Sequence, residues 1–224
     1  MRFEVLTEDR SGAIVMDRLM ERILSPLVSD YEVSVRPHRG RGDVPTNPYQ
    51  PPKAEASGLL DLLPAKLRAY DRVYAGSDFI LVVVMDSDYH SPAELKNELI
   101  TLCKKHAPSL PFVIGLCVEE TESWLIGDEQ ALLKAYPEAD LSVLENYQQD
   151  SVCGTWEVLC RCVLGNKAER IIRVGYPAIG QYKHEWALRI SEYMEPDKNV
   201  SPSFKRFLSY LSFIVQKALE PINP

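Results

Sequence analysis

The sequence lacks the patterns by which several large protein classes are recognised. Neither the GxxxxGK(S/T) pattern of P-loop proteins nor the GxGxxG fingerprint of dinucleotide-binding proteins occurs in it. No apolar run is long enough to cross a bilayer, and the first residues, MRFEVLTEDR, lack the apolar core of a signal peptide. The sequence therefore predicts a cytoplasmic chain without a membrane segment and without either nucleotide-binding loop.

The chain also lacks an excess of positive charge and an even set of cysteines. It has 25 Lys and Arg against 32 Asp and Glu, a net charge of −7, which argues against a protein that coats nucleic acid. A nuclease is compatible with this charge, because bound metal ions compensate an acidic active site. The 5 cysteines predict free thiols, and the one-residue gap between Cys160 and Cys162 does not match a zinc knuckle or a thioredoxin motif.

The central feature of the sequence is the stretch FILVVVMDSD at residues 79–88. Its apolar run predicts a strand that is buried on both faces and ends at Asp86 and Asp88. If the extended conformation continues, both carboxylates point the same way, at the end of a parallel strand where open α/β sheets bind ligands. Oxygen-only ligation favours Mg²⁺ or Mn²⁺. The alternative is that the two acids merely begin a loop.

Strands and amphipathic helices alternate over the first half of the chain, and the second half is helical. Strands are predicted at residues 2–7, 31–36, 79–86 and 112–118, and helices at residues 13–27, 58–74 and 92–106. Further helices are predicted at residues 128–136, 155–164, 178–194 and 203–217. This order predicts an α/β fold with a mostly parallel, Rossmann-like sheet and flanking helices. We interpret residues 1–127 as an α/β core and residues 128–224 as a helical extension packed on it, within one domain.

Acidic residues follow two other predicted strands. Glu8 comes after the first strand, and Glu119, Glu120 and Glu122 come after the strand at residues 112–118. Because the carboxyl ends of parallel strands meet at one edge of a sheet, these acids are expected to join the Asp-x-Asp pair in one cluster. The alternatives are an acid that the helix dipole favours, for Glu8, and an ordinary acidic first helical turn, for the three later glutamates.

Basic residues occur at two places that could serve a phosphate. The loop PHRGRGD at residues 37–43 carries Arg39 and Arg41 beside two glycines, and its side chains and backbone N–H groups could approach a phosphate. A solvated basic turn explains this loop equally well. Lys183 begins the segment KHEWA and could approach the acidic cluster or a phosphate, or it could be a solvated helix residue.

A glutamate after the first strand, an Asp-x-Asp pair after a later strand and further glutamates resemble the TOPRIM domain of topoisomerases, primases and overcoming-lysogenization-defect nucleases. Several segments are still more similar to a TOPRIM-like bacterial family, domain-of-unknown-function family 4276. These segments are residues 6–9, 40–43, 83–88, 119–125, 183–187 and 201–204, so the resemblance covers nearly the whole chain. One departure is Asp9, which stands where a glycine usually follows the first glutamate.

The resemblance implies a metal-dependent nuclease or a related phosphoryl-transfer enzyme that acts on nucleic acid. Asp86, Asp88 and either Glu122 or Glu119 would hold one or two Mg²⁺ or Mn²⁺ ions, which polarise the phosphate and activate water. Glu8 would be a metal ligand or the general acid/base.

The remaining implications concern cations and partners. Arg39 and Arg41 would bind phosphate, and Lys183 would assist catalysis. The resemblance also implies a bacterial defence role in which an ATPase partner participates and delivers the nucleic acid. The second hypothesis is a non-catalytic binding or regulatory subunit of an ATPase complex. Association of several copies of the chain is left open.

Overall fold

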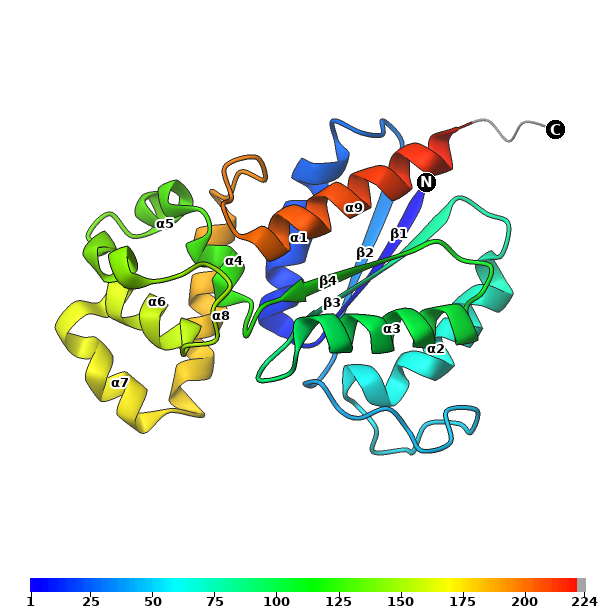
Figure 1. The fold of residues 1–224 in the computed structure, drawn as a ribbon, viewed down its shortest axis with the longest axis horizontal. Coiled ribbons are helices and arrows are strands. Elements are labelled where there is room, and N and C mark those ends of the chain that lie inside the picture. Colours follow the sequence, from blue (N-terminus) through cyan, green and yellow to red (C-terminus); the bar gives the residue numbers. More distant parts are fainter. Residues whose placement is uncertain (221–224) are drawn as a thin grey trace.

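A parallel sheet forms the centre of the fold. The computed structural model describes residues 1–220, in which four strands pair in the order β2-β1-β3-β4, all parallel (Figure 1). Helices flank this sheet, so the predicted α/β fold with a parallel sheet is confirmed. The strands are β1 (Arg2–Thr7), β2 (Glu32–Pro37), β3 (Phe79–Asp86) and β4 (Phe112–Cys117).

The helices fall into two groups along the chain. Those that connect strands are α1 (Arg10–Leu24), α2 (Leu59–Tyr74) and α3 (Pro92–His106). Those that follow β4 are α4 (Glu122–Ile126), α5 (Glu129–Ala135), α6 (Thr155–Leu164), α7 (Ala168–Val174), α8 (Ala178–Ser191) and α9 (Pro202–Leu219). Two short 3-10 helices lie at Leu141–Asn146 and Gly165–Lys167. Within residues 1–220 no helix is both long enough and apolar enough to span a membrane.

The two faces of the sheet are covered by different helices. Val82 and Val84 belong to the apolar layer that contains α1 and α9, whereas Leu81 and Val83 belong to the layer that contains α2 and α3. The chain therefore leaves β1 through a helix on one face and leaves the neighbouring β3 through a helix on the other. The connections thus diverge between β1 and β3, and open α/β sheets bind ligands at the carboxyl ends of the strands beside such a point.

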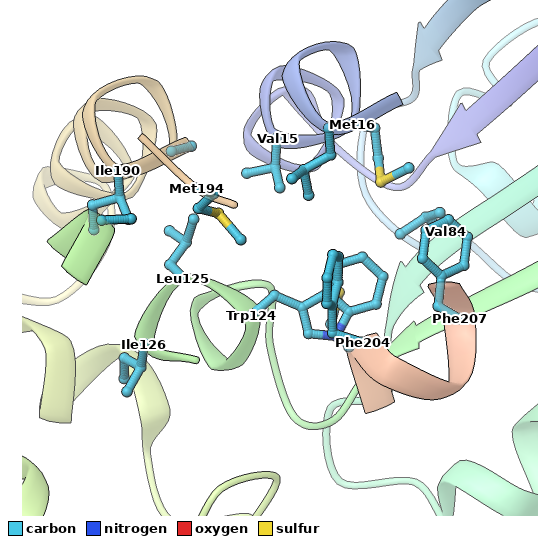
Figure 2. Packing of buried hydrophobic residues seen from close by; sticks show 14 of the residues in the cluster. Val15, Met16, Val84, Trp124, Leu125, Ile126, Ile190, Met194, Phe204 and Phe207 are labelled. Atoms are coloured by element: carbon cyan, nitrogen blue, oxygen red, sulfur yellow. The ribbon is translucent and has the colours of Figure 1, made fainter. Parts of the chain in front are cut away.

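The helices after β4 pack on the sheet through an aromatic cluster (Figure 2). Trp124 of α4 is fully buried, and its ring lies 5.1 Å from that of Phe204 and 5.4 Å from that of Phe207, both on α9. Its Nε1 donates a hydrogen bond of 2.9 Å to Ser203 Oγ. Gly115 of β4 makes room for this cluster, since a Cβ there would lie 2.9 Å from the Phe207 ring.

The same helices extend the structure beyond the carboxyl end of the sheet. Figure 1 shows α4 to α8 grouped past the ends of β3 and β4, and α9 returning along the sheet. α8 packs against α1, and α9 packs against β4. This arrangement brings side chains of α8 to the carboxyl ends of the strands.

The strands and the long helices are confirmed, with corrections at some ends: α1 ends at Leu24 instead of residue 27, and α8 ends at Ser191 instead of residue 194. α1 begins at Arg10 instead of residue 13, because the Asp9 side chain caps it through a bond from the Gly12 N–H. α4 and α7 were not predicted, since five and seven residues are too few to show a clear helical period.

Replacing Trp124 with Ala should lower the free energy of unfolding by about 3–5 kcal/mol, because a cavity would separate α9 from the sheet. Trp156→Ala is the matched control and should cost clearly less, since that indole is only half-buried. Urea unfolding of both variants measures the difference. Equal losses would contradict the central role of Trp124 in joining the two halves of the chain.

Candidate functional site

The candidate site lies at the carboxyl ends of β1 and β3. Glu8 is the first residue after β1, and Asp86 is the last residue of β3. The register pairs Thr7 with Val84, so the two strands end side by side. The sequence analysis expected acids from these strands to meet at one edge because the strands would be parallel. The structure shows this parallel pairing.

Backbone contacts fix the position of Glu8. The Gly40 N–H donates a 2.9 Å hydrogen bond to the Glu8 carbonyl, which ties the loop after β2 to this residue. On the other side, Thr7 Oγ1 donates to the Asp9 carbonyl at 2.9 Å, and Asp9 Oδ1 accepts from the Gly12 N–H at 2.8 Å. Glu8 is therefore held between a strand end and a capped helix. Its Oε2 is buried and has no hydrogen-bond partner among the described residues.

Asp86 is held by a threonine from the segment after β4. Thr121 Oγ1 donates a 2.8 Å hydrogen bond to Asp86 Oδ1. A Cβ placed on Gly12 would lie 3.9 Å from Thr121 Oγ1 and 3.4 Å from Asp9 Oδ1, so the start of α1 adjoins both groups. The first turn of α1, the end of β3 and the segment after β4 thus meet at one place.

Burial and like charges make these acids hard to ionise. Burial raises the pKa of Glu8 to about 7, and the charges of Asp88 and Asp9 act in the same direction. Burial also holds the pKa of Asp86 well above its usual value; Lys183 opposes this effect, and the charges of Glu122 and Glu8 add to it. Carboxylates that repel one another in a partly dry site favour a cation between them.

Lys183 supplies one such cation from within the chain. Its Nζ lies 3.2 Å from Glu122 Oε2 and 3.5 Å from Glu120 Oε1. Burial opposes protonation of Lys183, but the combined charges of Glu122, Glu120 and Asp86 outweigh it and hold its pKa above the usual range. Lys183 lies within α8 and is buried, so it is a fixed counter-ion of the acidic cluster.

The glutamates after β4 have different surroundings. Burial raises the pKa of Glu120 to about 7, and burial also raises the pKa of Glu122, while Lys183 opposes both shifts. Glu122 is 1% exposed, and its Oε1 has no hydrogen-bond partner in the described part of the chain. Glu122 faces the cluster that contains Asp86, whereas Glu120 also accepts a 3.3 Å bond from the Trp156 N–H.

Glu119 has a separate structural task. Its carboxylate accepts hydrogen bonds from the N–H groups of Cys153, Gly154 and Thr155 at 3.2, 2.8 and 2.9 Å, and from the Thr155 hydroxyl. Burial disfavours its charge, but these four donors together hold the pKa of Glu119 below its usual value. Both oxygens are thus engaged at the start of α6, and of the predicted acids after β4 the geometry favours Glu122 over Glu119 as a site residue.

Asp88 departs from the expected geometry. The expectation that the strand continues through it is wrong, because β3 ends at Asp86 and Asp88 has a left-handed φ of 47°. Its N–H donates a 2.9 Å bond to the Glu119 carbonyl, which turns the chain away from the strand direction. Its carboxylate lies 3.5 Å from Arg41 Nη1, and its negative charge raises the pKa of Glu8. Because the Asp88 side chain is also 41% exposed, it lies at the border between the site and solvent.

The two arginines of the basic loop differ in their contacts. Arg41 is partly buried and holds Asp88, and its Nη1 also lies 2.9 Å from His90 Nδ1. Arg39 is exposed, and its side chain makes no hydrogen bond or ion pair within the described residues. The Gly40 contact with Glu8 places this loop beside the acids, as a phosphate-binding role requires, and Arg39 is the arginine that is free to move toward a ligand.

Two residues of the site were not among the predicted ones. Asp9 caps α1 and acts on the charges of both Glu8 and Asp86, and Thr121 binds Asp86 directly. The spacing of Asp9 and Gly12 matches a helix N-cap and could have revealed the first contact. Nothing local in the sequence identifies Thr121, whose partner lies 35 residues away.

No protein family, curated protein or solved structure gives a significant match to this chain. The resemblance to TOPRIM domains therefore stays a prediction. The functional argument depends on the geometry of the site.

A divalent metal fits the donor set at the ends of β1 and β3. Glu8 and Asp86 offer hard oxygen donors, and the buried Glu8 Oε2 without a partner is the kind of atom that a cation would satisfy. Within residues 1–220 no three His, Cys, Asp or Glu side chains are arranged to hold one ion. Two carboxylates are sufficient for Mg²⁺, because it keeps several waters and takes further oxygens from a phosphate.

Glu8→Gln should change how stability depends on pH. The pKa of Glu8 is about 7 in the folded chain against 4.5 for an ordinary glutamate, so folding favours its protonated form. In the parent chain, ionisation of Glu8 therefore lowers the free energy of unfolding. This loss is absent below about pH 4.5 and grows as pH rises. Above pH 7 it reaches about 2 kcal/mol, allowing for solvent screening.

The glutamine variant lacks this charge and should be more stable than the parent chain at pH 8 and equal to it at pH 4.5. Urea unfolding with a metal chelator present measures both. Glu21→Gln, at an exposed position of α1, serves as control. A constant difference between Glu8→Gln and the parent across this range would contradict the assignment.

Glu119→Gln should lower the free energy of unfolding by about 2–3 kcal/mol, because four donors at the start of α6 lose a charged acceptor. The same variant should bind Mg²⁺ as the parent chain does, since Glu119 lies outside the Glu8–Asp86 pair. Urea unfolding and calorimetric titration with Mg²⁺ test the two statements. If Glu119→Gln lost metal binding at unchanged stability, Glu119 would be a metal ligand and not a residue that holds the start of α6.

Proposed function

We propose that this chain is a metal-dependent phosphoryl-transfer enzyme of nuclease type, which acts on nucleic acid. The observation that carries the proposal is the pair Glu8 and Asp86, two acids of raised pKa at the switch point of a parallel sheet. A buried, unpartnered Glu8 oxygen and the adjoining loop with Arg39 and Arg41 support it further. The resemblance to TOPRIM nucleases agrees with this assignment.

Each residue of the pair has a role that follows from its surroundings. Glu8 and Asp86 would hold Mg²⁺ or Mn²⁺, which supplies charge stabilisation at a phosphate and lowers the pKa of a bound water. In the alternative role, as the general acid/base instead of a metal ligand, a pKa of about 7 gives Glu8 both protonation states near neutral pH, which suits a group that takes up and releases a proton. Thr121 orients the Asp86 carboxylate, and Asp9 fixes the start of α1 beside it.

The cations around the pair divide into fixed and movable groups. Lys183 neutralises the buried glutamates after β4, so it would shape the field of the site and leave phosphate contacts to other residues. Arg41 would exchange its ion pair with Asp88 for a phosphate oxygen, because the pair is 3.5 Å long and borders solvent. Arg39 is exposed on the same loop and would bind a second phosphate.

A second candidate is a non-catalytic binding subunit of an ATPase complex. It is favoured by the position of Lys183, which occupies part of the acidic cluster with a permanent charge, and by the lack of a three-residue metal group within residues 1–220. In that case the acidic cluster would be a structural ion-pair network. The two candidates differ in whether the Glu8–Asp86 pair binds metal.

The Asp86→Asn variant separates the candidates. With single-stranded DNA or RNA and Mg²⁺ or Mn²⁺, the parent chain should cleave, and Asp86→Asn should lose at least about 100-fold of the rate, as expected when a catalytic group is removed. Asp17→Asn, an exposed aspartate on α1, is the matched control and should retain the parent rate. Equal background rates in all three proteins would reject the enzyme.

Calorimetric titration with Mg²⁺ completes the test, because it needs no substrate. Binding by the parent chain that is lost in both Asp86→Asn and Glu8→Gln supports a metal site even without cleavage. No binding by the parent chain would favour the structural ion-pair network.

A further inference from the structure

A groove runs along the free edge of β4 between two helices. β4 is the last strand in the order β2-β1-β3-β4, and Figure 1 shows α3 on one side of it and α9 on the other. Three adjoining cavities, of about 420, 240 and 560 Å³, lie in this space and share Lys96 as a lining residue. We call them together the α3–α9 groove.

The groove has an apolar floor and basic walls. Ile114 of β4 lines two of the cavities, next to other apolar side chains of the same strand. The walls carry four cations, Lys96 and Lys104 from α3 and Lys205 and Arg206 from α9. Residues 92, 96, 100 and 104 recur every fourth position on α3, and on α9 residues 206, 210 and 213 share one side while Lys205 stands in the adjoining row with residues 209 and 213.

The charge of the groove is unlike that of the whole chain. No Asp or Glu of the described residues lines any of the three cavities, although the chain has a net charge of −7. Of the four cations only Arg206 has an ion pair in residues 1–220, with Asp150 at a long 3.9 Å, and its side chain is 64% exposed. Four cations with so little internal compensation indicate a polyanionic ligand.

Aromatic side chains stand beside these cations. Tyr210 and Phe213 of α9 are 40% and 55% exposed, and their rings lie 6.3 Å apart with an angle of 22° between their planes. Both line the third cavity, and Lys96 lies 5.9 Å from the Tyr210 ring across the groove. Exposed ring planes next to a basic track are the combination by which proteins hold unpaired nucleic-acid bases.

The shape of the groove and the place where it ends also favour a single-stranded nucleic acid as its ligand. Its floor is the edge strand β4 and its walls are two helices, a shape that suits one extended chain better than a double helix. Ser91 and Val118 form one end of the groove. Ser91 lies three residues after Asp88, and Val118 lies directly before Glu119. A chain that follows the groove would therefore leave it at the carboxyl ends of the strands, next to the Glu8–Asp86 site.

We propose that the α3–α9 groove binds single-stranded nucleic acid and leads it to the Glu8–Asp86 site. The binding statement stands on the groove alone, and the statement about direction rests on the proposed function. The cations contact phosphates, and Tyr210 and Phe213 stack with bases.

The first test removes two cations. Fluorescence anisotropy with a labelled oligothymidylate of about 12 nucleotides, in a metal chelator, compares Lys96→Ala/Arg206→Ala with the parent chain. Binding at low salt should weaken at least roughly tenfold, and the slope of log affinity against log salt should fall by about 1.4, or about 0.7 for each lost cation.

Lys167→Ala/Arg170→Ala is the matched control, because it removes the same charge from exposed positions around α7, away from the groove. It should leave both quantities unchanged. Equal effects of the two double variants would overturn the proposal, since they would show only a general effect of net charge.

The second test separates the contribution of base stacking from that of phosphate contacts. Tyr210→Ala and Phe213→Ala should each weaken binding roughly tenfold while the salt slope stays constant, because stacking involves no released counter-ion. Unchanged affinity in both variants would contradict base stacking.

Competition identifies the class of ligand. Unlabelled oligothymidylate should compete better than a duplex of the same length and better than a polyglutamate peptide of the same charge. Equal competition by polyglutamate would assign the groove to an acidic peptide, and equal competition by duplex would contradict the one-chain width; either result overturns the proposal.

The groove and the proposed function fail in different experiments. Groove-dependent binding without any cleavage would reject the enzyme and leave the groove assignment intact. Cleavage with an unchanged KM in Lys96→Ala/Arg206→Ala would reject the groove as the path of the substrate.

Discussion

The ion pair between Lys183 and Glu122 is the interaction on which the acidic end of the sheet depends. The fold places Glu8, Asp86 and Glu122 in a region from which much water is excluded, and the charges of Glu122 and Glu8 both oppose ionisation of Asp86. A single buried ammonium group compensates part of this charge within bonding distance. Removal of one partner from such a pair leaves an uncompensated buried charge, which costs more than the pair contributes. α8 therefore belongs to the site as much as the strands do.

The route by which α8 reaches the site depends on apolar packing. Trp124 follows the glutamates after β4 by only two residues, and its burial against α9 fixes the start of α4. α8 in turn packs on α1, whose capped first turn adjoins Asp86. Residues of α1, α4, α8 and α9 belong to one continuous apolar cluster, part of which Figure 2 shows, and this packing limits how far the elements that carry the charged residues can move.

The sequence predicts those features that local chemistry determines. β3 was placed correctly at Phe79–Asp86 because a short apolar run that follows a turn favours a strand buried on both faces, and the parallel pairing followed from the alternation of strands with helices. The left-handed turn at Asp88 was missed because a hydrogen bond to the Glu119 carbonyl produces it. The task of Glu119 was missed for a similar reason, since its donors lie 34–36 residues further along the chain. Long-range partners have no signature in spacing.

One end of the α3–α9 groove, at Ser91 and Val118, lies close in sequence to Asp88 and to the glutamates after β4, so basic and acidic side chains follow one another there. A polyanion would be attracted to the basic stretch and then repelled where the carboxylates begin, so it would halt at the boundary between the two. In the proposed function, Glu8 and Asp86 would hold a divalent ion whose charge offsets that repulsion, so cation binding would favour the binding of a phosphate at the same place.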